Sequence, residues 1–387
     1  MNLDTYCPIP FSEMFVQSNG NVLMCCDTYT NYVGNVNDSS LSEIFHSSFL
    51  NDVRKSFTSG EKHNICNVCW KREEDTGSSY RTYWNSQGGI EILSGHKLTD
   101  YKEFAQKAST RIRRIKVDFS TACNMKCPMC SIDRSTGWLK DHTKIFEPIK
   151  QEKLNNITSQ LPLSFIDDNW EHFVNSNVID LSGGEPFYMP QVKYLLDRLE
   201  EERYNGILKV ITNASLIEPF IDQLTKFNTQ LVISCDGYGD LYPYVRPSVG
   251  KTISWQKLES NLKLLREANI IHGFCYVPQL INIHNIEDWI NWHSSVYGDS
   301  TGALGLPLHK PKHMRIEHYP NEDYKHKLAD KLEKHNWNRF DQNDSRALVK
   351  QLRMQSDNTQ YEKFLTYMAK LDDVRNSNFM AIWAENT

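Results

Sequence analysis

The sequence predicts an α/β protein in which a partial (β/α)6 barrel lies between a small cysteine-rich N-terminal unit and a helical C-terminal cap. Strand-length apolar runs alternate with amphipathic helical segments over residues 111–320. Eight of the ten cysteines precede residue 131. At 387 residues the chain exceeds one average domain. We therefore expect four segments, which cover residues 1–80, 81–110, 111–320 and 321–387.

The composition is that of an ordinary folded protein. Hydrophobic residues make up 40% and charged residues 24% of the chain, near the averages for globular domains. A net charge of -5 supplies no basic field for phosphates, so nucleic acid is not expected as a partner. No run approaches the roughly 18 apolar residues of a membrane span, and the N-terminus lacks a signal-peptide pattern. We therefore expect a cytoplasmic protein, whose reduced and clustered cysteines bind metal or carry out chemistry.

Residues 1–80 predict a small hairpin unit followed by a helix. Their short apolar runs are broken by turn residues, among them Asn19-Gly20-Asn21 and Gly34-Asn35. The following apolar positions predict a helix over residues 41–57. A unit with so little apolar sequence needs a metal or a neighbour to stabilise it, and its cysteines offer a metal site. The polar residues 81–110 are expected to form a connector.

The segment 111–320 has the alternating pattern of a parallel α/β sheet. Six strands are predicted over residues 115–119, 178–181, 208–212, 231–235, 273–279 and 314–318. Between them, apolar residues recur at helical spacing, as at Val192, Leu195 and Leu199. Strand-helix repetition of this length predicts an open, TIM-like partial barrel.

Two further stretches flank or interrupt the barrel pattern. Residues 131–177 are too long for a simple connection and are expected to carry a substrate-facing loop. Trp138 and Trp170 in this stretch either line a pocket or belong to the core. Residues 321–387 are charged and helix-rich, and we expect a helical cap packed on the barrel. Its predicted buried positions are Leu328, Leu332, Leu348, Leu352, Phe364, Met368 and Leu371.

Cys123, Cys127 and Cys130 follow the first predicted barrel strand. In parallel barrels the catalytic groups gather at this edge, because the strand-to-helix loops meet there. Three thiolates so closely spaced can bind three irons of one [4Fe-4S] cubane and leave the fourth iron without a protein ligand. A zinc knuckle is the alternative, but structural zinc takes four ligands and no nearby histidine completes the set. The spacing therefore predicts an iron-sulfur cluster with one open iron.

The spacing Cys-x-x-x-Cys-x-x-Cys after a first barrel strand resembles the signature of the radical SAM superfamily. The resemblance implies that the open iron binds the amino and carboxylate groups of S-adenosylmethionine, and that an electron from the cluster breaks the sulfonium bond. Cys123, Cys127 and Cys130 are then both cluster ligands and the catalytic group. The family usually has an aromatic residue before the third cysteine, where this chain has Met129. A polarisable thioether could pack on adenine instead.

Gly183, Gly184 and Glu185 follow the second predicted strand. Glycine allows the backbone to approach a ligand, and a neighbouring carboxylate can accept hydrogen bonds from an ammonium group. A Gly-Gly pair alone is also typical of a simple turn. In this position it resembles the radical SAM motif that holds the cofactor's amino group, and Glu185 falls at the matching acidic position.

Later polar residues are similar to other cofactor-binding positions of the family. Asn213, Ser234 and Asp236 lie in segments that resemble those lining the ribose and methionyl parts of S-adenosylmethionine. Arg246 lies where many relatives place an arginine that can fork onto the cofactor's carboxylate. The alternative for Arg246 is a solvated surface side chain. Asn282 is a further candidate for a cofactor contact.

The N-terminal cysteines resemble the auxiliary-cluster module called SPASM or, in its shorter form, twitch. The resemblance implies a second [4Fe-4S] cluster with Cys7, Cys25, Cys66 and Cys69 as ligands and Cys26 as a spectator. Four ligands would saturate this cluster, which favours electron transfer or a structural role. Zinc is the alternative, because four thiolates suit either metal. In the commonest family layout the module follows the barrel, whereas here it precedes it.

The resemblance implies that the cofactor is cleaved to a 5'-deoxyadenosyl radical, which abstracts hydrogen from a substrate. Relatives act on peptides, protein side chains or small metabolites, and an auxiliary cluster favours a net oxidation or a cross-link. An external reductant such as flavodoxin or ferredoxin is then a partner. The alternative is a non-catalytic iron-sulfur or zinc scaffold or electron carrier. A zinc-stapled nucleic-acid module is disfavoured by the net charge of -5.

Overall fold

The computed structural model describes residues 5–28, 31–77, 79–94, 111–338 and 341–384. Its backbone forms two compact units. The first unit comprises Met1–Thr121, Thr158–Val210 and Asp222–Gln230. The second comprises Ala122–Ile157, Ile211–Ile221 and Leu231–Thr387. The division into four segments stays a prediction.

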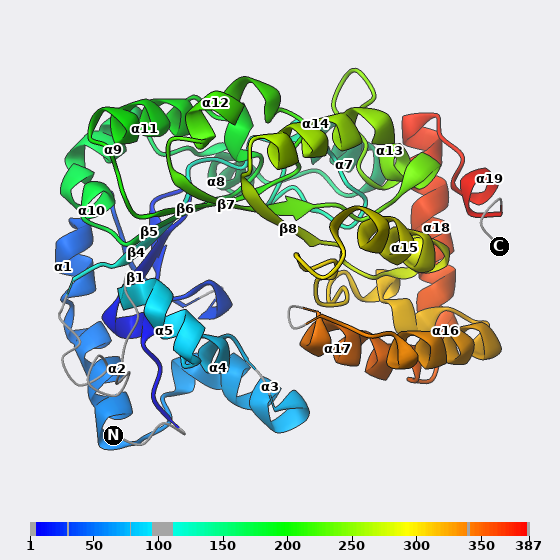
Figure 1. Cartoon of the computed structure of the whole chain (residues 1–387), viewed down its shortest axis with the longest axis horizontal. Helices are drawn as coiled ribbons and strands as arrows, with labels where there is room; N and C mark the ends of the chain where they lie inside the picture. Colours follow the sequence, from blue (N-terminus) through cyan, green and yellow to red (C-terminus); the bar gives the residue numbers. More distant parts are fainter. Residues whose placement is uncertain (1–4, 29–30, 78, 95–110, 339–340, 385–387) are drawn as a thin grey trace. The chain divides into compact units, whose positions relative to one another are not determined.

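The strands of the described residues form one sheet in the order β3-β2-β1-β4-β5-β6-β7-β8 (Figure 1). Their bounds are β1 (Glu13–Val16), β2 (Asn21–Leu23), β3 (Tyr32–Asn35), β4 (Arg114–Asp118), β5 (Val178–Ser182), β6 (Ile207–Thr212), β7 (Asn228–Ser234) and β8 (Ile271–Cys275). β4, β5 and β6 are parallel neighbours. The α/β class with a parallel barrel-type sheet is thereby confirmed.

Five of the six predicted barrel strands are present, displaced by a few residues at most ends. The sixth, over residues 314–318, is wrong, because Lys312–Met314 and Ile316–His318 are short 3-10 helices. Apolar Met314 and Ile316 alternate with polar Arg315 and Glu317 in the sequence, and this pattern resembles that of a strand. The backbone N–H groups of Met314 and His318 instead donate to carbonyl groups three residues back, so they are not free for a sheet.

The predicted N-terminal hairpin is confirmed, and it also extends the sheet. β1 pairs with β2 in antiparallel fashion, with Phe15 opposite Leu23. Gly20 closes the turn between them at φ +85°, a conformation that glycine adopts without strain. β1 also pairs in parallel with β4, with Glu13 opposite Arg114. The cysteine-rich segment is therefore joined to the barrel strands by a backbone ladder.

The predicted helix over residues 41–57 is two helices, α1 (Leu41–Phe45) and α2 (Ser48–Ser59). The break occurs at Ser47, whose hydroxyl oxygen accepts from the Leu50 N–H at 3.4 Å and caps the second helix. The other helices that lie wholly in the first unit are α3 (Asn67–Thr76), α4 (Tyr80–Trp84), α5 (Gln87–Ser94), α9 (Leu163–Asp168), α10 (Trp170–Val174) and α11 (Pro190–Glu201). The later part of the predicted connector, residues 95–110, lies outside the described residues.

The two faces of the β4–β6 sheet differ in polarity. Ile115 and Val117 are completely buried, and Phe119 continues this face to contact Phe165 of α9 at a ring-centroid distance of 6.4 Å. Figure 1 shows α9, α10 and α11 beside this part of the sheet. The opposite face carries charged side chains, beginning with Arg114, whose neighbours include α4. The apolar core of the unit thus lies under α9–α11, and the other face is polar.

The second unit is dominated by helices. They are α7 (Leu139–Ile145), α8 (Gln151–Thr158, whose last residue belongs to the first unit), α13 (Tyr242–Val245), α14 (Trp255–Glu267), α15 (Ile286–Tyr297), α16 (Glu322–Lys334), α17 (Gln342–Leu352), α18 (Asn358–Arg375) and α19 (Phe379–Ala384). A short helix, α12 (Ile221–Leu224), begins at the boundary between the units. All predicted buried positions of the C-terminal helices are confirmed.

The stretch 131–177, predicted to carry a long loop, consists largely of the short helices α7 to α10. Trp138 retains only 2% exposure and belongs to the core. Trp170 is half-buried and lies under the Arg198 guanidinium, 4.0 Å from its ring centroid. Within the described part of the chain, no helix is long and apolar enough to span a membrane.

Candidate functional site

The cluster loop, residues 123–130, follows β4 in the chain. Cys127 is buried, and Cys123 and Cys130 are half-buried. The Met125 N–H points at Cys123 Sγ at 3.4 Å, and the Cys130 N–H donates to the Cys127 carbonyl at 2.9 Å. An N–H group directed at sulfur stabilises the thiolate form that an iron cluster requires.

A backbone segment of the second unit pairs with the cluster loop. The Lys126 N–H donates to the Pro247 carbonyl at 2.8 Å, and the Val249 N–H donates to the Asn124 carbonyl at 2.7 Å. Met125 and Ser248 form an antiparallel bridge between these two bonds. The first half of the loop is therefore held like a short strand, which fixes its backbone conformation.

Asn213, a predicted cofactor residue, also positions the cluster loop. Its Nδ2 donates to Asn124 Oδ1 at 2.9 Å, and Asn124 Nδ2 donates to Ser215 Oγ at 2.9 Å. The Ser215 hydroxyl donates to Asn213 Oδ1 at 2.6 Å and closes the ring of side chains. This network is local to the second unit and orients the residue between the first two cysteines of the motif.

Three consecutive carbonyl groups of the cluster loop accept hydrogen bonds from side chains that the sequence did not single out as site residues. Trp138 Nε1 donates to the Cys127 carbonyl at 2.8 Å. From α18, Tyr367 donates to the Pro128 carbonyl at 2.6 Å and Arg375 Nη2 donates to the Lys126 carbonyl at 2.7 Å. The two α18 residues lie more than 230 positions from the loop, so no local pattern could have identified them.

The thiols of the cluster loop lie in an environment that disfavours charge without a metal. Burial raises the pKa of Cys127, and the Arg246 guanidinium partly opposes this shift. Burial also raises the pKa of Cys130 to about 12, with a further contribution from Cys127. Soft, closely spaced thiols of this kind release their protons when they bind iron, so the donor set fits an iron-sulfur cluster.

Gly183 takes its conformation from backbone packing within the first unit. Its φ is +109°, and an added Cβ would lie 2.6 Å from the Ser120 carbonyl oxygen. The Gly184 N–H donates to the same carbonyl at 3.0 Å. A side chain at position 183 would therefore push the loop after β5 away from the segment that precedes the cluster loop.

Glu185, the acidic residue of this motif, is 1% exposed. One of its carboxylate oxygens accepts from the Phe187 N–H at 3.3 Å and caps the short helix Pro186–Tyr188. A buried carboxylate forms stronger charge-assisted hydrogen bonds than an exposed one, which suits the recognition of an ammonium group.

Arg246 and Asp236 form a buried pair in the second unit. Arg246 Nε donates to Asp236 Oδ2 at 2.8 Å, and Nη2 donates to the same oxygen at 2.5 Å. The Arg246 side chain is 12% exposed, so the alternative of a solvated surface arginine does not hold. Asp236 Oδ1 accepts from the Val277 N–H at 2.9 Å. Asn282 Nδ2 donates to the carbonyls of Asp236 and Val277, so this amide braces the loop.

Two other predicted cofactor residues, Met129 and Ser234, are half-buried side chains of the second unit. Met129 lies inside the cluster loop, and Ser234 is the last residue of β7. Partial exposure leaves surface on both side chains for a ligand.

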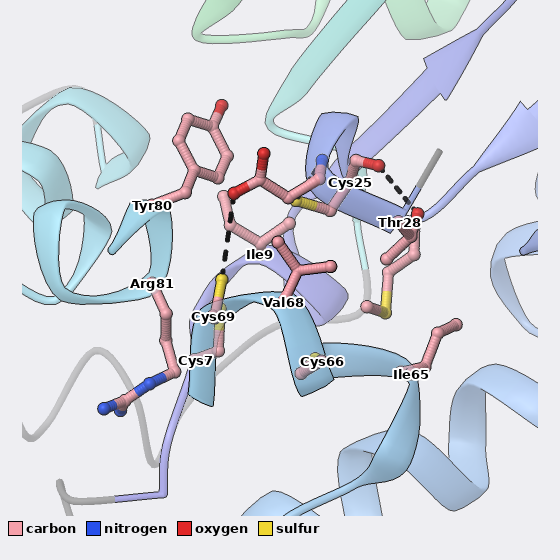
Figure 2. Close-up of a pocket in the computed structure, with 12 residues that line it drawn as sticks. Cys7, Ile9, Cys25, Thr28, Ile65, Cys66, Val68, Cys69, Tyr80 and Arg81 are labelled. Atoms are coloured by element: carbon pink, nitrogen blue, oxygen red, sulfur yellow. Dashed lines mark hydrogen bonds between the residues drawn. The ribbon is translucent and has the colours of Figure 1, made fainter. Parts of the chain in front are cut away.

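Four cysteines of the N-terminal segment line one cavity in the first unit (Figure 2). They are Cys7, Cys25, Cys66 and Cys69. Cys66 precedes the first turn of α3 and Cys69 lies within it, so one helix end supplies two of the sulfurs. Cys69 Sγ contacts Asp27 Oδ2 at 3.9 Å, and that carboxylate pairs with Arg72 at 2.9 Å.

The structure distinguishes the adjacent Cys25 and Cys26. Cys25 lines the cavity, and its sulfur accepts from the Asp27 N–H at 3.4 Å. Cys26 is not among the described residues that line it. Its electrostatic neighbours include Lys116 and Glu13. Cys25 as the ligand and Cys26 as the spectator stays a prediction.

The cavity thiols are costly to ionise without a bound metal. Burial raises the pKa of Cys66 to about 12, and the neighbouring Cys69 adds to the shift. Burial also raises the pKa of Cys7, with Cys66 as the next contribution. Among the described residues, no three His, Cys, Asp or Glu side chains form a group that could hold a metal ion. A cubane takes one cysteine on each iron, so its ligands need not converge on a single point.

Two family models match the chain. The radical SAM superfamily model matches residues 117–293, and the SPASM iron-sulfur cluster-binding domain model matches residues 7–70. The chain therefore contains a radical SAM domain over residues 117–293. At its N-terminal end it carries an iron-sulfur cluster-binding domain of the SPASM type. The radical SAM domain implies a [4Fe-4S] cluster and S-adenosylmethionine as cofactors. The SPASM domain implies an auxiliary iron-sulfur cluster at the N-terminal cysteines and not zinc.

Several solved structures match the chain at low sequence identity. Native anSMEcpe with bound AdoMet is 14% identical over 57% of this chain and 60% of that chain, with a TM-score of 0.40. Streptococcus suis SuiB is 14% identical over 84% of this chain and 69% of that chain, also with a TM-score of 0.40. The match thus spans about three fifths of the anSMEcpe chain. No curated protein matches the sequence.

Proposed function

We propose that the chain is an enzyme that reductively cleaves S-adenosylmethionine and abstracts a hydrogen atom from its substrate. The supporting observation is the cluster loop, whose backbone is hydrogen-bonded by residues 247–249, Trp138 and α18 of the second unit. When bound at Cys123, Cys127 and Cys130, the cluster supplies the electron that breaks the sulfonium bond and yields the 5'-deoxyadenosyl radical. The substrate is a peptide, a protein side chain or a small metabolite.

In this proposal the first unit recognises the amino group of S-adenosylmethionine. Gly183 and Gly184 keep the loop after β5 close to the end of β4, through the shared Ser120 carbonyl. Glu185 holds its carboxylate in a buried position, where it accepts from the ammonium group. The role of the chain is to orient the cofactor and to exclude water from it.

The second unit supplies the other proposed cofactor contacts. Asp236 engages Nε and Nη2 of Arg246, which leaves Nη1 to donate to the cofactor's carboxylate. Met129 packs on the adenine. Asn213 and Ser234 line the ribose and methionyl parts, and the hydrogen bonds of Asn213 to the cluster loop keep these contacts in register with the cysteines.

We assign the auxiliary cluster to the cavity lined by Cys7, Cys25, Cys66 and Cys69. Four cysteine ligands leave no iron free, so this site transfers electrons or stabilises the fold and does not bind the substrate. An electron acceptor near a substrate radical favours a net oxidation or a cross-link. The first electron comes from an external reductant such as flavodoxin or ferredoxin.

The test is the formation of 5'-deoxyadenosine under anaerobic, reducing conditions. Cys127→Ala should abolish it, because the cubane loses one of three ligands. Cys275→Ala is the control, since Cys275 is a half-buried cysteine of β8 outside both cysteine sets. Undiminished product from the Cys127 variant overturns the proposal.

A second measurement separates the enzyme from a non-catalytic scaffold. The anaerobically reconstituted protein should bind S-adenosylmethionine, because residues 183–185 are proposed to hold its amino group. A non-catalytic scaffold would not require this glycine-glutamate motif. A reconstituted protein that ignores S-adenosylmethionine supports the scaffold or electron carrier.

A further inference from the structure

A row of charged side chains crosses the polar face of the first unit's sheet. The register places Lys116 of β4 opposite Asp180 of β5, and Asp180 opposite Lys209 of β6. Residues paired in a parallel sheet point to the same face, so these three side chains lie side by side. Phe15 of β1 is paired with Lys116 at the end of the row. We call Lys116, Asp180 and Lys209 the lysine row.

On the same face of the sheet, the position next to the lysine row is occupied by Arg114 and covered by other side chains. Arg114 lies two residues before Lys116, and its guanidinium bridges Glu13 and Asp180. The Tyr80 hydroxyl accepts from Arg114 Nη1 at 2.8 Å, and the Trp84 ring centroid lies 4.8 Å from the guanidinium carbon. Helix α4 therefore covers Arg114 and forms a floor beside the lysine row.

Charge in the lysine row is not balanced by local ion pairs. No hydrogen bond or ion pair joins the ammonium group of Lys116 or Lys209 to another residue in the described part of the chain. Lys116 lies 5.2 Å from the Phe15 ring centroid. The row holds two ammonium groups and one carboxylate, and that carboxylate is already shared with Arg114. Asp118 also acts electrostatically on Lys116, and Glu13 acts on Lys209.

Buried polar atoms in and beside the row lack partners. Asp180 is 1% exposed and Arg114 is 2% exposed, yet Asp180 Oδ1 and Arg114 Nε have no hydrogen-bond partner. Such atoms are costly to bury, and a ligand or water normally satisfies them. Asp180 Oδ1 accepts hydrogen bonds, so its partner is a donor such as water and not an anion. Solvent still reaches the row, because Lys209 is half-buried and Lys116 keeps 8% of its surface.

The two lysines differ in electrostatic setting. Burial lowers the pKa of Lys116, but Asp180, Cys26 and Asp118 outweigh it and the net shift is upward. Burial lowers the pKa of Lys209, and Asp180 only partly restores it. Both ammonium groups have lost much of their water, so an added negative charge would stabilise them.

We propose that Lys116 and Lys209 together bind an oxyanion, a carboxylate or a phosphate, carried by the substrate. Lys116 lies two residues, or about 6.6 Å, before Asp118 at the end of β4. Asp118 is paired with Ser182, which directly precedes Gly183. The anion would thus lie between the floor at Arg114 and the edge that carries the glycine-glutamate motif. The identification of the bound molecule as substrate rests on the proposed function, whereas the anion site does not.

Isothermal titration of the full chain, with its clusters reconstituted, tests this site. The probes are inorganic phosphate and acetate. Lys116→Met and Lys209→Met should each raise the dissociation constant about 10- to 100-fold, the value of one charge-assisted hydrogen bond. Lys257→Met is the control, because Lys257 of α14 is exposed and pairs with Glu218 of the short helix Glu218–Phe220. Binding of phosphate alone indicates a phosphorylated substrate, and binding of acetate alone indicates a carboxylate.

Either of two results overturns the anion site. One is wild-type protein that binds neither probe, and the other is binding that both lysine variants retain. Lys116→Arg keeps the charge and should keep the binding, which separates loss of the ion pair from misfolding. A protein that binds a probe through these lysines but forms no 5'-deoxyadenosine refutes the proposed function and leaves the anion site intact.

Discussion

Arg114 concentrates the buried charge of the first unit in one side chain. It is 2% exposed and bridges Glu13 and Asp180, which are 0% and 1% exposed. Burial raises the pKa of Asp180, yet Lys116 and Arg114 outweigh it and hold that pKa below its usual range. The pKa of Glu13 is raised instead, because burial dominates there. Asp180 therefore depends on the cations beside it to stay ionised.

Arg114→Met should destabilise the protein by about 3–5 kcal/mol, because it leaves two buried carboxylates without their common partner. Chemical denaturation followed by circular dichroism measures the change. Lys257→Met removes an exposed ion pair and should have little effect. Equal stability of the two variants would contradict the assignment of Arg114 as the buried bridge.

The burial of His293 predicts that the stability of the second unit depends on pH. It is 2% exposed, and burial lowers its pKa from 6.5 to about 4, with a smaller contribution from His272. Between these values the unfolded chain binds the proton and the folded chain does not. The contribution of the neutral His293 ring to the free energy of unfolding is thus complete above about pH 6.5. It decreases as the pH drops, by at most about 1.4 kcal/mol per pH unit.

His293→Gln should therefore flatten the decrease in unfolding free energy between about pH 6.5 and pH 4. Glutamine can keep a hydrogen bond to Thr301, which lies 2.9 Å from the histidine ring nitrogen. His284 and His318 shift in the same direction, so part of the slope should persist. A slope identical to that of the wild type would show that His293 does not titrate in this range.

At the level of elements, α18 stands out because it connects the C-terminal region to the cluster loop. Arg375 Nε pairs with Asp141 of α7 at 2.7 Å, and its guanidinium carbon lies 4.7 Å from the Trp138 ring centroid. Together with Tyr367, it satisfies carbonyl groups of the loop directly. The apolar spacing of α18 predicted a buried face, and the polar contacts at the same helix add a positioning role.

Arg375→Met should loosen the cluster loop, because the Lys126 carbonyl and Asp141 lose a charged partner. The expected loss of stability is about 2 kcal/mol, and Tyr367→Phe should cost about 1 kcal/mol. Both variants should lose iron to a chelator faster than the wild type. Arg353→Met is the matched control, since Arg353 is an exposed residue paired with Asp330 and Glu333. Chelation rates unchanged in both α18 variants would remove α18 from the support of the loop.

For the whole molecule, the iron content tests the two cysteine sets together. Two cubanes correspond to about eight irons per chain. Cys25→Ala should lower this number to about four, because it removes a cavity ligand. Cys26→Ala changes the adjacent residue, which lies outside the cavity lining, and should retain about eight. The reverse outcome would assign the ligand to Cys26.

Local patterns in the sequence were sufficient for the strands, most helices and the cysteine motif. The period-two and helical spacings report burial directly, so β4 to β8 and the C-terminal helices were predictable. The same reasoning failed at residues 314–318, where apolar and polar residues alternate in sequence but lie in two short 3-10 helices. An alternation of apolar and polar residues does not by itself determine to which carbonyl group a backbone N–H group donates its hydrogen bond.

By itself the sequence determined the proposal for the chemistry of this protein, because three cysteines at fixed spacing after a strand predict a cluster with one open iron. Tertiary structure alone decided which distant groups support that chemistry. The pairing of β1 with β4 and the contacts of α18 with the cluster loop both join residues far apart in the chain. Such contacts depend on how elements pack and on side-chain direction, and a single sequence carries no local signal for either.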